Sequence, residues 1–173
     1  MQAFIDLVRW MSRISGVVSI LLILVSILVV CQMIFVRSVL GESSIWQTEF
    51  VTFALIAATF IGAPYILMTH GHVNVDLLPL YLGHNARIWL ALAASLIALG
   101  FSLLVAWNSL HWWQEAFAGG HVTSSMWRAR LWIPYLSVPV GMGLLCLQYV
   151  ADIICLLTGR GLPFGLKPED GIR

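Results

Sequence analysis

The stretch ISGVVSILLILVSILVVCQMIFV, residues 14–36, has 23 residues and no charged side chain. A helix rises about 1.5 Å per residue and the hydrocarbon core of a bilayer is about 30 Å thick, so a helix of this length crosses a membrane. Three further uncharged, apolar stretches follow at Phe50–Met68, Ile88–Trp107 and Leu131–Ala151. Such continuous runs are not the alternating strands of a membrane β-barrel, and only helices and closed barrels satisfy their backbone hydrogen bonds in lipid. The sequence therefore predicts an all-α membrane protein with four transmembrane helices.

The composition leaves no room for a soluble catalytic domain. Of the 173 residues, 60% are hydrophobic and 10% are charged, whereas a typical soluble domain has about 25% charged residues. Nine Lys and Arg balance eight Asp and Glu, which gives no basic surface for nucleic acid. The first span is longer than the h-region of a signal peptide and no small-residue cleavage site follows it, so we expect it to be retained. We predict one membrane domain over residues 1–173, with an amphipathic segment 1–13, spans at about 14–36, 46–68, 88–110 and 131–157, and a tail 158–173.

Lys and Arg are distributed unevenly between the two sides of the membrane. The N-terminal segment, the middle loop and the tail share one side and hold six of them, whereas Arg37, Arg128 and Arg130 lie on the other side. Because cytoplasmic flanks carry the excess of positive charge, we expect both termini in the cytoplasm.

Two segments have the composition of short interfacial amphipathic helices. In residues 2–13, Phe4, Leu7, Val8 and Met11 fall on one arc of a helix. This segment either lies in the membrane interface or extends the first span, and the sequence favours neither. Residues 73–82 of the middle loop are too apolar for a solvated loop and too few to span, which predicts a helix along the membrane surface.

Small residues and prolines interrupt the spans. Ala58 and Gly62 form a small-xxx-small pair, which lets another helix approach closely. Pro134 and Pro139 predict an irregular outer half of the fourth span. Such faces pack either on each other or on a larger partner, and internal packing is the more economical interpretation of any one pair.

The outer end of the second span holds polar and aromatic residues. Glu49 lies in the first turn of the predicted helix, where a negative charge is favoured, and Arg37 lies at the same level. An ion pair between them is the simplest interpretation; a partner contact and a transport role are the alternatives. Trp46 is expected at headgroup depth, and Trp112 and Trp113 belong to an aromatic belt after the third span.

The chain lacks the parts of an enzyme. All five histidines lie in loops or at span ends, so they cannot face each other across a bundle as haem ligands do. There is no Gly-rich phosphate loop, no nucleophile elbow and no paired carboxylate in a common cleft. We therefore predict no catalytic, cofactor or metal residues. The candidate residues for contacts with a partner are Arg37, Trp46, Glu49, Ala58, Gly62, His72, Asp76, Trp112, Trp113, Pro134 and Pro139.

An ordered set of residues resembles a known family. The set is Trp46, Glu49, Gly62, Ala63, His72, Val75 and Asp76, followed by LWIPYLSVPVG at residues 131–141. It resembles the small integral-membrane subunit, of the DctQ type, of tripartite ATP-independent periplasmic (TRAP) transporters. Many members carry a second acid before the Glu and an Arg or Tyr one turn after it, whereas this chain has Gln47, Thr48 and Phe53 there.

The resemblance implies a division of labour in a bacterial inner membrane. A large membrane subunit would bind sodium and move an organic acid by an elevator-like motion, and a soluble periplasmic protein would deliver the solute. The small subunit would be a scaffold, or stator, with no cofactor of its own, in contact with the large subunit and with membrane lipid. One alternative is a self-contained proton-coupled transporter that works as a homodimer and uses Glu49. Another is the membrane anchor of a redox complex, which the scattered histidines disfavour.

Overall fold

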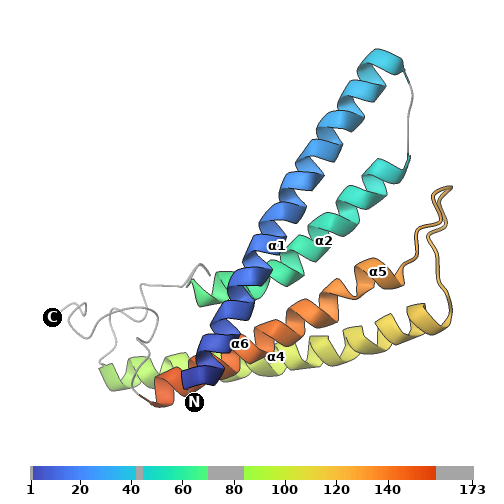
Figure 1. The fold of residues 1–173 in the computed structure, drawn as a ribbon. Coiled ribbons are helices and arrows are strands. Elements are labelled where there is room, and N and C mark those ends of the chain that lie inside the picture. Colours follow the sequence, from blue (N-terminus) through green and yellow to red (C-terminus); the bar gives the residue numbers. More distant parts are fainter. Residues whose placement is uncertain (1, 42–44, 70–83, 159–173) are drawn as a thin grey trace.

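The computed structural model describes residues 2–41, 45–69 and 84–158. The helices are α1 (Gln2–Phe35), the π-helical turn η1 (Val36–Leu40), α2 (Ile45–Met68), α4 (His84–Ala118), α5 (Trp132–Tyr135) and α6 (Ser137–Leu157) (Figure 1). Within these described ranges, four helical segments are long and apolar enough to cross a membrane: α1 with η1, α2, α4, and α5 with α6. The predicted all-α membrane protein with four spans is therefore confirmed.

The helices form an open row. Helix α1 packs on α2, α2 packs on α6, and α6 packs on α4, while α1 touches α6 over a shorter stretch. We call the end where α1 begins and α6 ends the terminal end, and the opposite end the hairpin end. The α1–α2 pair and the α4–α6 pair diverge from the terminal end toward the hairpin end (Figure 1). The fold is thus closed at one end and open at the other.

Helix α1 is continuous from Gln2 through the first span. Its 34 residues make it about 51 Å long, which is more than the hydrocarbon core requires. Phe4 and Leu7, from the arc that the sequence singled out, are exposed, whereas Ile5 and Val8 are buried. Among the described residues, the N-terminal segment is helical and continuous with the first span.

Small residues form the interface between α1 and α2. The hydroxyl of Ser19 donates a hydrogen bond to the carbonyl oxygen of Ala58 across 2.7 Å. A methyl group at Gly62 would lie 2.6 Å from that hydroxyl oxygen. The predicted small-residue pair of the second span therefore packs inside the chain, and α1 already covers it.

Helix α6 approaches α2 even more closely. A methyl group at Gly141 would collide with the backbone of Phe60 and Ile61. On its other side, α6 contacts α4, whose buried residues Ser102, Ser109 and Ala116 recur every seventh position. Because seven residues are nearly two helical turns, these small side chains form one stripe along α4.

The fourth span is interrupted at Leu136, which separates α5 from α6. The hydroxyl of Ser137 donates a hydrogen bond to the carbonyl oxygen of Pro134 across 2.6 Å. Pro139 is buried in the first turn of α6, where a backbone N–H has no partner within the helix and its absence is tolerated. The irregularity that the two prolines predict is therefore present.

The predicted interfacial helix at residues 73–82 lies outside the described residues, as do His72 and Asp76. Both residues remain predictions from the sequence.

Candidate functional site

The hairpin end is organised by residues 121–131, which fold back on themselves between α4 and α5. Backbone hydrogen bonds run from the N–H of Leu131 to the carbonyl of His121 and from the N–H of Thr123 to the carbonyl of Ala129, each at 3.0 Å. The Thr123 hydroxyl oxygen accepts a further bond from the N–H of Ala129 at 3.0 Å. Arg128 turns the chain with a φ of 49°, which is uncommon for a residue with a side chain. We call this segment the hairpin; its bonds fix the backbone that carries Arg128 and Arg130.

Trp46 connects α2 to the hairpin. Its ring centroid lies 6.4 Å from that of Trp127, with the two planes tilted by 57°. Aromatic pairs at this separation contribute about 0.5–1.5 kcal/mol beyond the area they bury. The role predicted for Trp46 was contact with lipid or a partner; the structure adds a contact with the hairpin, which the sequence did not indicate.

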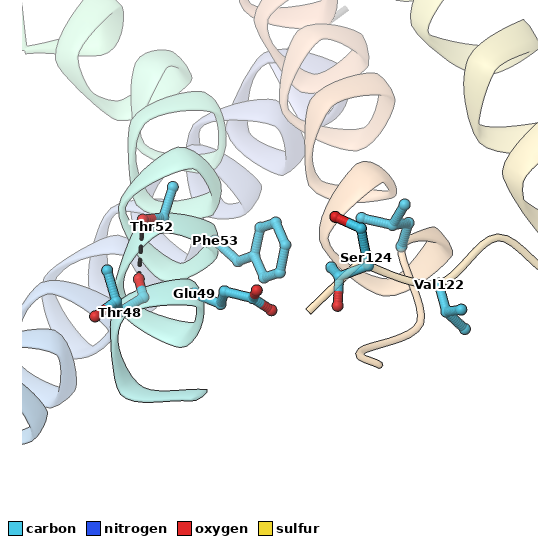
Figure 2. A pocket seen from close by; sticks show the side chains of 8 residues that line it. Thr48, Glu49, Thr52, Phe53, Val122 and Ser124 are labelled. Atoms are coloured by element: carbon cyan, nitrogen blue, oxygen red, sulfur yellow. Dashed lines mark hydrogen bonds between the residues drawn. The ribbon is translucent and has the colours of Figure 1, made fainter. Parts of the chain in front are cut away.

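Glu49 faces a hollow between α2 and the hairpin. This pocket, of about 510 Å³, is lined by Thr48, Glu49, Thr52, Phe53, Val122, Thr123, Ser124 and Leu131. The carboxylate of Glu49 points from α2 across the hollow toward the hairpin (Figure 2). Its Oε2 atom is buried and has no hydrogen-bond partner among the described residues. The expected pairing with Arg37, which is exposed in η1, is therefore not formed at this oxygen.

A larger cavity, the wedge, opens where the two helix pairs diverge. It has a volume of about 590 Å³. Its walls come from α1, α2, the hairpin, α5 and α6: Leu22, Phe50, Phe53, Ala54, Ala57, Ile61, Trp127, Arg128, Ala129, Arg130, Ile133, Pro134, Leu136, Ser137 and Val140. Most of these side chains are apolar, and the two charged ones belong to the hairpin. Pro134, a candidate from the sequence, thus lines the wedge.

The aromatic residues that the sequence placed after the third span lie in the last turns of α4, because this helix continues to Ala118, and two of them belong to a cluster. The rings of Trp113 and Phe117 stack with centroids 5.6 Å apart, and Phe117 meets the edge of Trp132 at 5.7 Å. This cluster joins the end of α4 to α5. Trp112 has 70% of its surface exposed, so it remains available to lipid or a partner, as an aromatic belt residue would be.

At the terminal end, a buried polar chain joins α1 to α6. The hydroxyl of Ser12 donates a hydrogen bond to Oε1 of Gln148 across 2.8 Å, and Nε2 of Gln148 donates to Oδ1 of Asp152 across 3.1 Å. Sequence position alone did not indicate this link between Ser12 and Gln148. The signal it missed is the spacing of Ser12, Ser15 and Ser19, which places all three on one face of α1.

The described residues hold no group of three or more His, Cys, Asp or Glu side chains that could bind a metal ion. Three of the candidates from the sequence lie around the hairpin: Trp46, Glu49 and Pro134. Three others are buried between helices: Ala58, Gly62 and Pro139.

The chain is similar in sequence to known membrane proteins. The family described as "Tripartite ATP-independent periplasmic transporters, DctQ component" matches residues 26–159. The "C4-dicarboxylate TRAP transporter small permease protein DctQ" of Pseudomonas aeruginosa is 29% identical over 133 residues, which cover 75% of this chain and 63% of that protein. The protein of the same description from Vibrio cholerae is 24% identical over 148 residues, covering 73% of this chain and 64% of that protein.

The matches thus span less than two thirds of the length of each of these relatives. No solved structure matches the chain. The family match runs from the last third of α1 to just beyond α6, and it includes the hairpin, the Glu49 pocket and every residue of the wedge lining except Leu22. The chain therefore belongs to the DctQ family of TRAP transporter components.

Proposed function

We propose that this chain is the small, non-catalytic membrane subunit of a TRAP-type secondary transporter. In this proposal it is a scaffold beside a large sodium-coupled subunit, which imports an organic acid delivered by a periplasmic binding protein. Both termini lie in the cytoplasm and the hairpin end faces the periplasm. Family membership supports the assembly, and the Lys and Arg distribution supports the orientation.

The observation that carries the scaffold role is the interlocked packing of α1, α2 and α6. Hydrogen bonds join α1 to α2 through Ser19 and α1 to α6 through Ser12. Gly141 brings α6 against the backbone of α2. A helix that slid or rocked against its neighbours in this chain would break such contacts in every cycle. The packing therefore supports a chain whose three helices stay together as one rigid element, as a scaffold requires.

The outward faces of the helices are suited to a larger partner. Ile97, Phe101 and Leu104 on α4 follow a helical spacing and are 75%, 66% and 61% exposed. Gly100, between them, has no neighbouring atoms within 4 Å of an added methyl group. In the membrane such a face is covered by lipid or by another helix. We propose that the large subunit and lipid share these faces.

Glu49 supplies a test of this function. A buried carboxylate oxygen without a partner is costly, and a basic or hydroxyl group of the large subunit would satisfy it. Glu49→Gln should then lower the yield of the complex purified through a tag on the large subunit, while the apparent affinities for sodium and solute in proteoliposomes stay nearly unchanged. Glu115→Gln is the matched control, because Glu115 is an exposed acid near the same end.

The same experiment separates the scaffold from a self-contained transporter. Reconstituted alone, the chain should move no organic acid; sodium-driven uptake by the chain alone would overturn the scaffold proposal. Intact assembly of the Glu49→Gln complex with a large shift in solute or sodium affinity would instead place Glu49 in the transport step.

A further inference from the structure

We propose that the wedge is a phospholipid site. One acyl chain lies between α2 and the α5–α6 segment, and the lipid phosphate lies against Arg128 and Arg130 of the hairpin. This inference concerns the chain by itself and does not depend on its role in a transporter.

The wedge exists because close packing of α2 and α6 ends partway along the two helices. At Gly141 the two backbones meet, whereas toward the hairpin end Phe53 and Ala57 of α2 face Ile133 and Val140 across the cavity. An unfilled apolar cavity forfeits the van der Waals contacts of its lining. In a membrane, lipid chains are the most abundant apolar groups available to restore those contacts.

The volume of the wedge favours an acyl chain over a transmembrane helix. A spanning helix with side chains is about 10–12 Å wide and about 30 Å long. The wedge has a volume of about 590 Å³, and its lining follows α2 only from Phe50 to Ile61, about 16 Å, so it is too short to take such a helix along its whole length. It falls within the range of about 300–1,000 Å³ that suits a small ligand. A slender acyl chain can enter such a space end-on.

The charge at the mouth of the wedge matches a phosphate. Arg128 and Arg130 are the two charged residues of its lining, and both are exposed. Glu49 lies in the neighbouring pocket, so these three side chains carry a net charge of about +1 at neutral pH. Arginine guanidinium groups bind phosphate through charge-assisted, often bidentate hydrogen bonds.

The depth of the mouth also fits a headgroup. The Trp46–Trp127 pair lies at the hairpin end beside the wedge, since Trp127 is part of its lining. Tryptophan prefers the membrane–water interface, where lipid phosphates lie. Hydrogen bonds of the hairpin hold the backbone that carries Arg128 and Arg130, so phosphate binding has to order only the two side chains and not the loop.

The test measures, by native mass spectrometry, how much lipid stays bound to the full chain in detergent. Two probes with the same acyl chains are added separately: phosphatidylglycerol, which has the phosphate, and diacylglycerol, which lacks it. We expect retention of one phosphatidylglycerol and little diacylglycerol. The double variant Arg128→Gln with Arg130→Gln removes both cations of the wedge lining and should weaken phosphatidylglycerol binding about 10-fold or more. Arg37→Gln is the matched control, since Arg37 is an exposed arginine outside the wedge, and it should bind as the original chain does.

A second variant tests the acyl chain rather than the phosphate. Ala57→Phe fills the wedge from α2 and should also abolish retention, whereas Ala93→Phe, at an exposed position of α4, should not. Circular dichroism and gel filtration confirm that each variant is folded. Equal retention by the original chain, the double arginine variant and Ala57→Phe would overturn the proposal. If Ala57→Phe prevents co-purification of a partner subunit while lipid retention is unchanged, the wedge belongs to that partner and the proposal is wrong.

Discussion

Replacing Gly141 by alanine should push α6 away from α2. The added methyl group would overlap the carbonyl group of Phe60 and lie 2.9 Å from the backbone nitrogen of Ile61. Because these atoms belong to the backbone of a transmembrane helix, no side-chain rotation relieves the overlap. The two helices must separate, and the close packing along their shared face is lost.

Gly143 provides a matched control in the same helix. A methyl group at Gly143 meets no atom within 4 Å. Glycine is less favourable than alanine in a helix by about 1 kcal/mol, and both variants gain this amount. Overpacking costs about 1–3 kcal/mol and applies only at Gly141. The difference between the two variants should therefore be about 1–3 kcal/mol, with Gly141→Ala the less stable.

The measurement is thermal unfolding of each variant in the same detergent. For a chain of about 150–250 residues, 1 kcal/mol shifts the Tm by about 2–4 °C. Gly141→Ala should therefore melt about 2–12 °C below Gly143→Ala. Equal melting temperatures for the two variants would mean that α2 and α6 do not meet at Gly141, and would refute the close packing of these two helices.

Two further predictions concern the polar chain and the topology. A double-mutant cycle tests the hydrogen bond between Ser12 and Gln148, using Ser12→Ala, Gln148→Leu and the double variant. Unfolding in detergent should give a coupling free energy of about 0.6–1.7 kcal/mol. Additive effects of the two substitutions would contradict the hydrogen bond. With the native cysteines replaced, Thr158→Cys should react with an impermeant maleimide only from the cytoplasm and Ser124→Cys only from the periplasm. Reversed labelling would invert the orientation proposed for the chain.

The four spans could be predicted because the membrane imposes a simple requirement. A backbone in lipid must satisfy its own hydrogen bonds over about 30 Å, and long uncharged stretches such as residues 14–36 have few other solutions. The interruption at Leu136 could also be predicted from the sequence, because Pro134 and Pro139 constrain the backbone around them in any fold. These features depend on local chemistry and chain length alone.

Which helix faces pack on each other could not be predicted from the sequence. In water, the apolar face of a helix marks the side that packs; in lipid, both the packed and the outward sides are apolar, so hydrophobicity does not distinguish them. Ala58 and Gly62 could have met a partner, and only the structure shows that Ser19 of α1 covers them.

The candidate site was predicted in part. Sequence position alone placed Trp46 and Glu49 at one end of the second span. The tertiary structure decided that Trp46 meets Trp127, from a segment 81 residues later in the chain, and that Glu49 faces the hairpin. Such contacts depend on how α2 and α6 cross and diverge. The sequence by itself therefore determined that this chain spans the membrane four times, and the tertiary structure alone decided where it is closed and where it is open, because that depends on backbone approach at a few small residues.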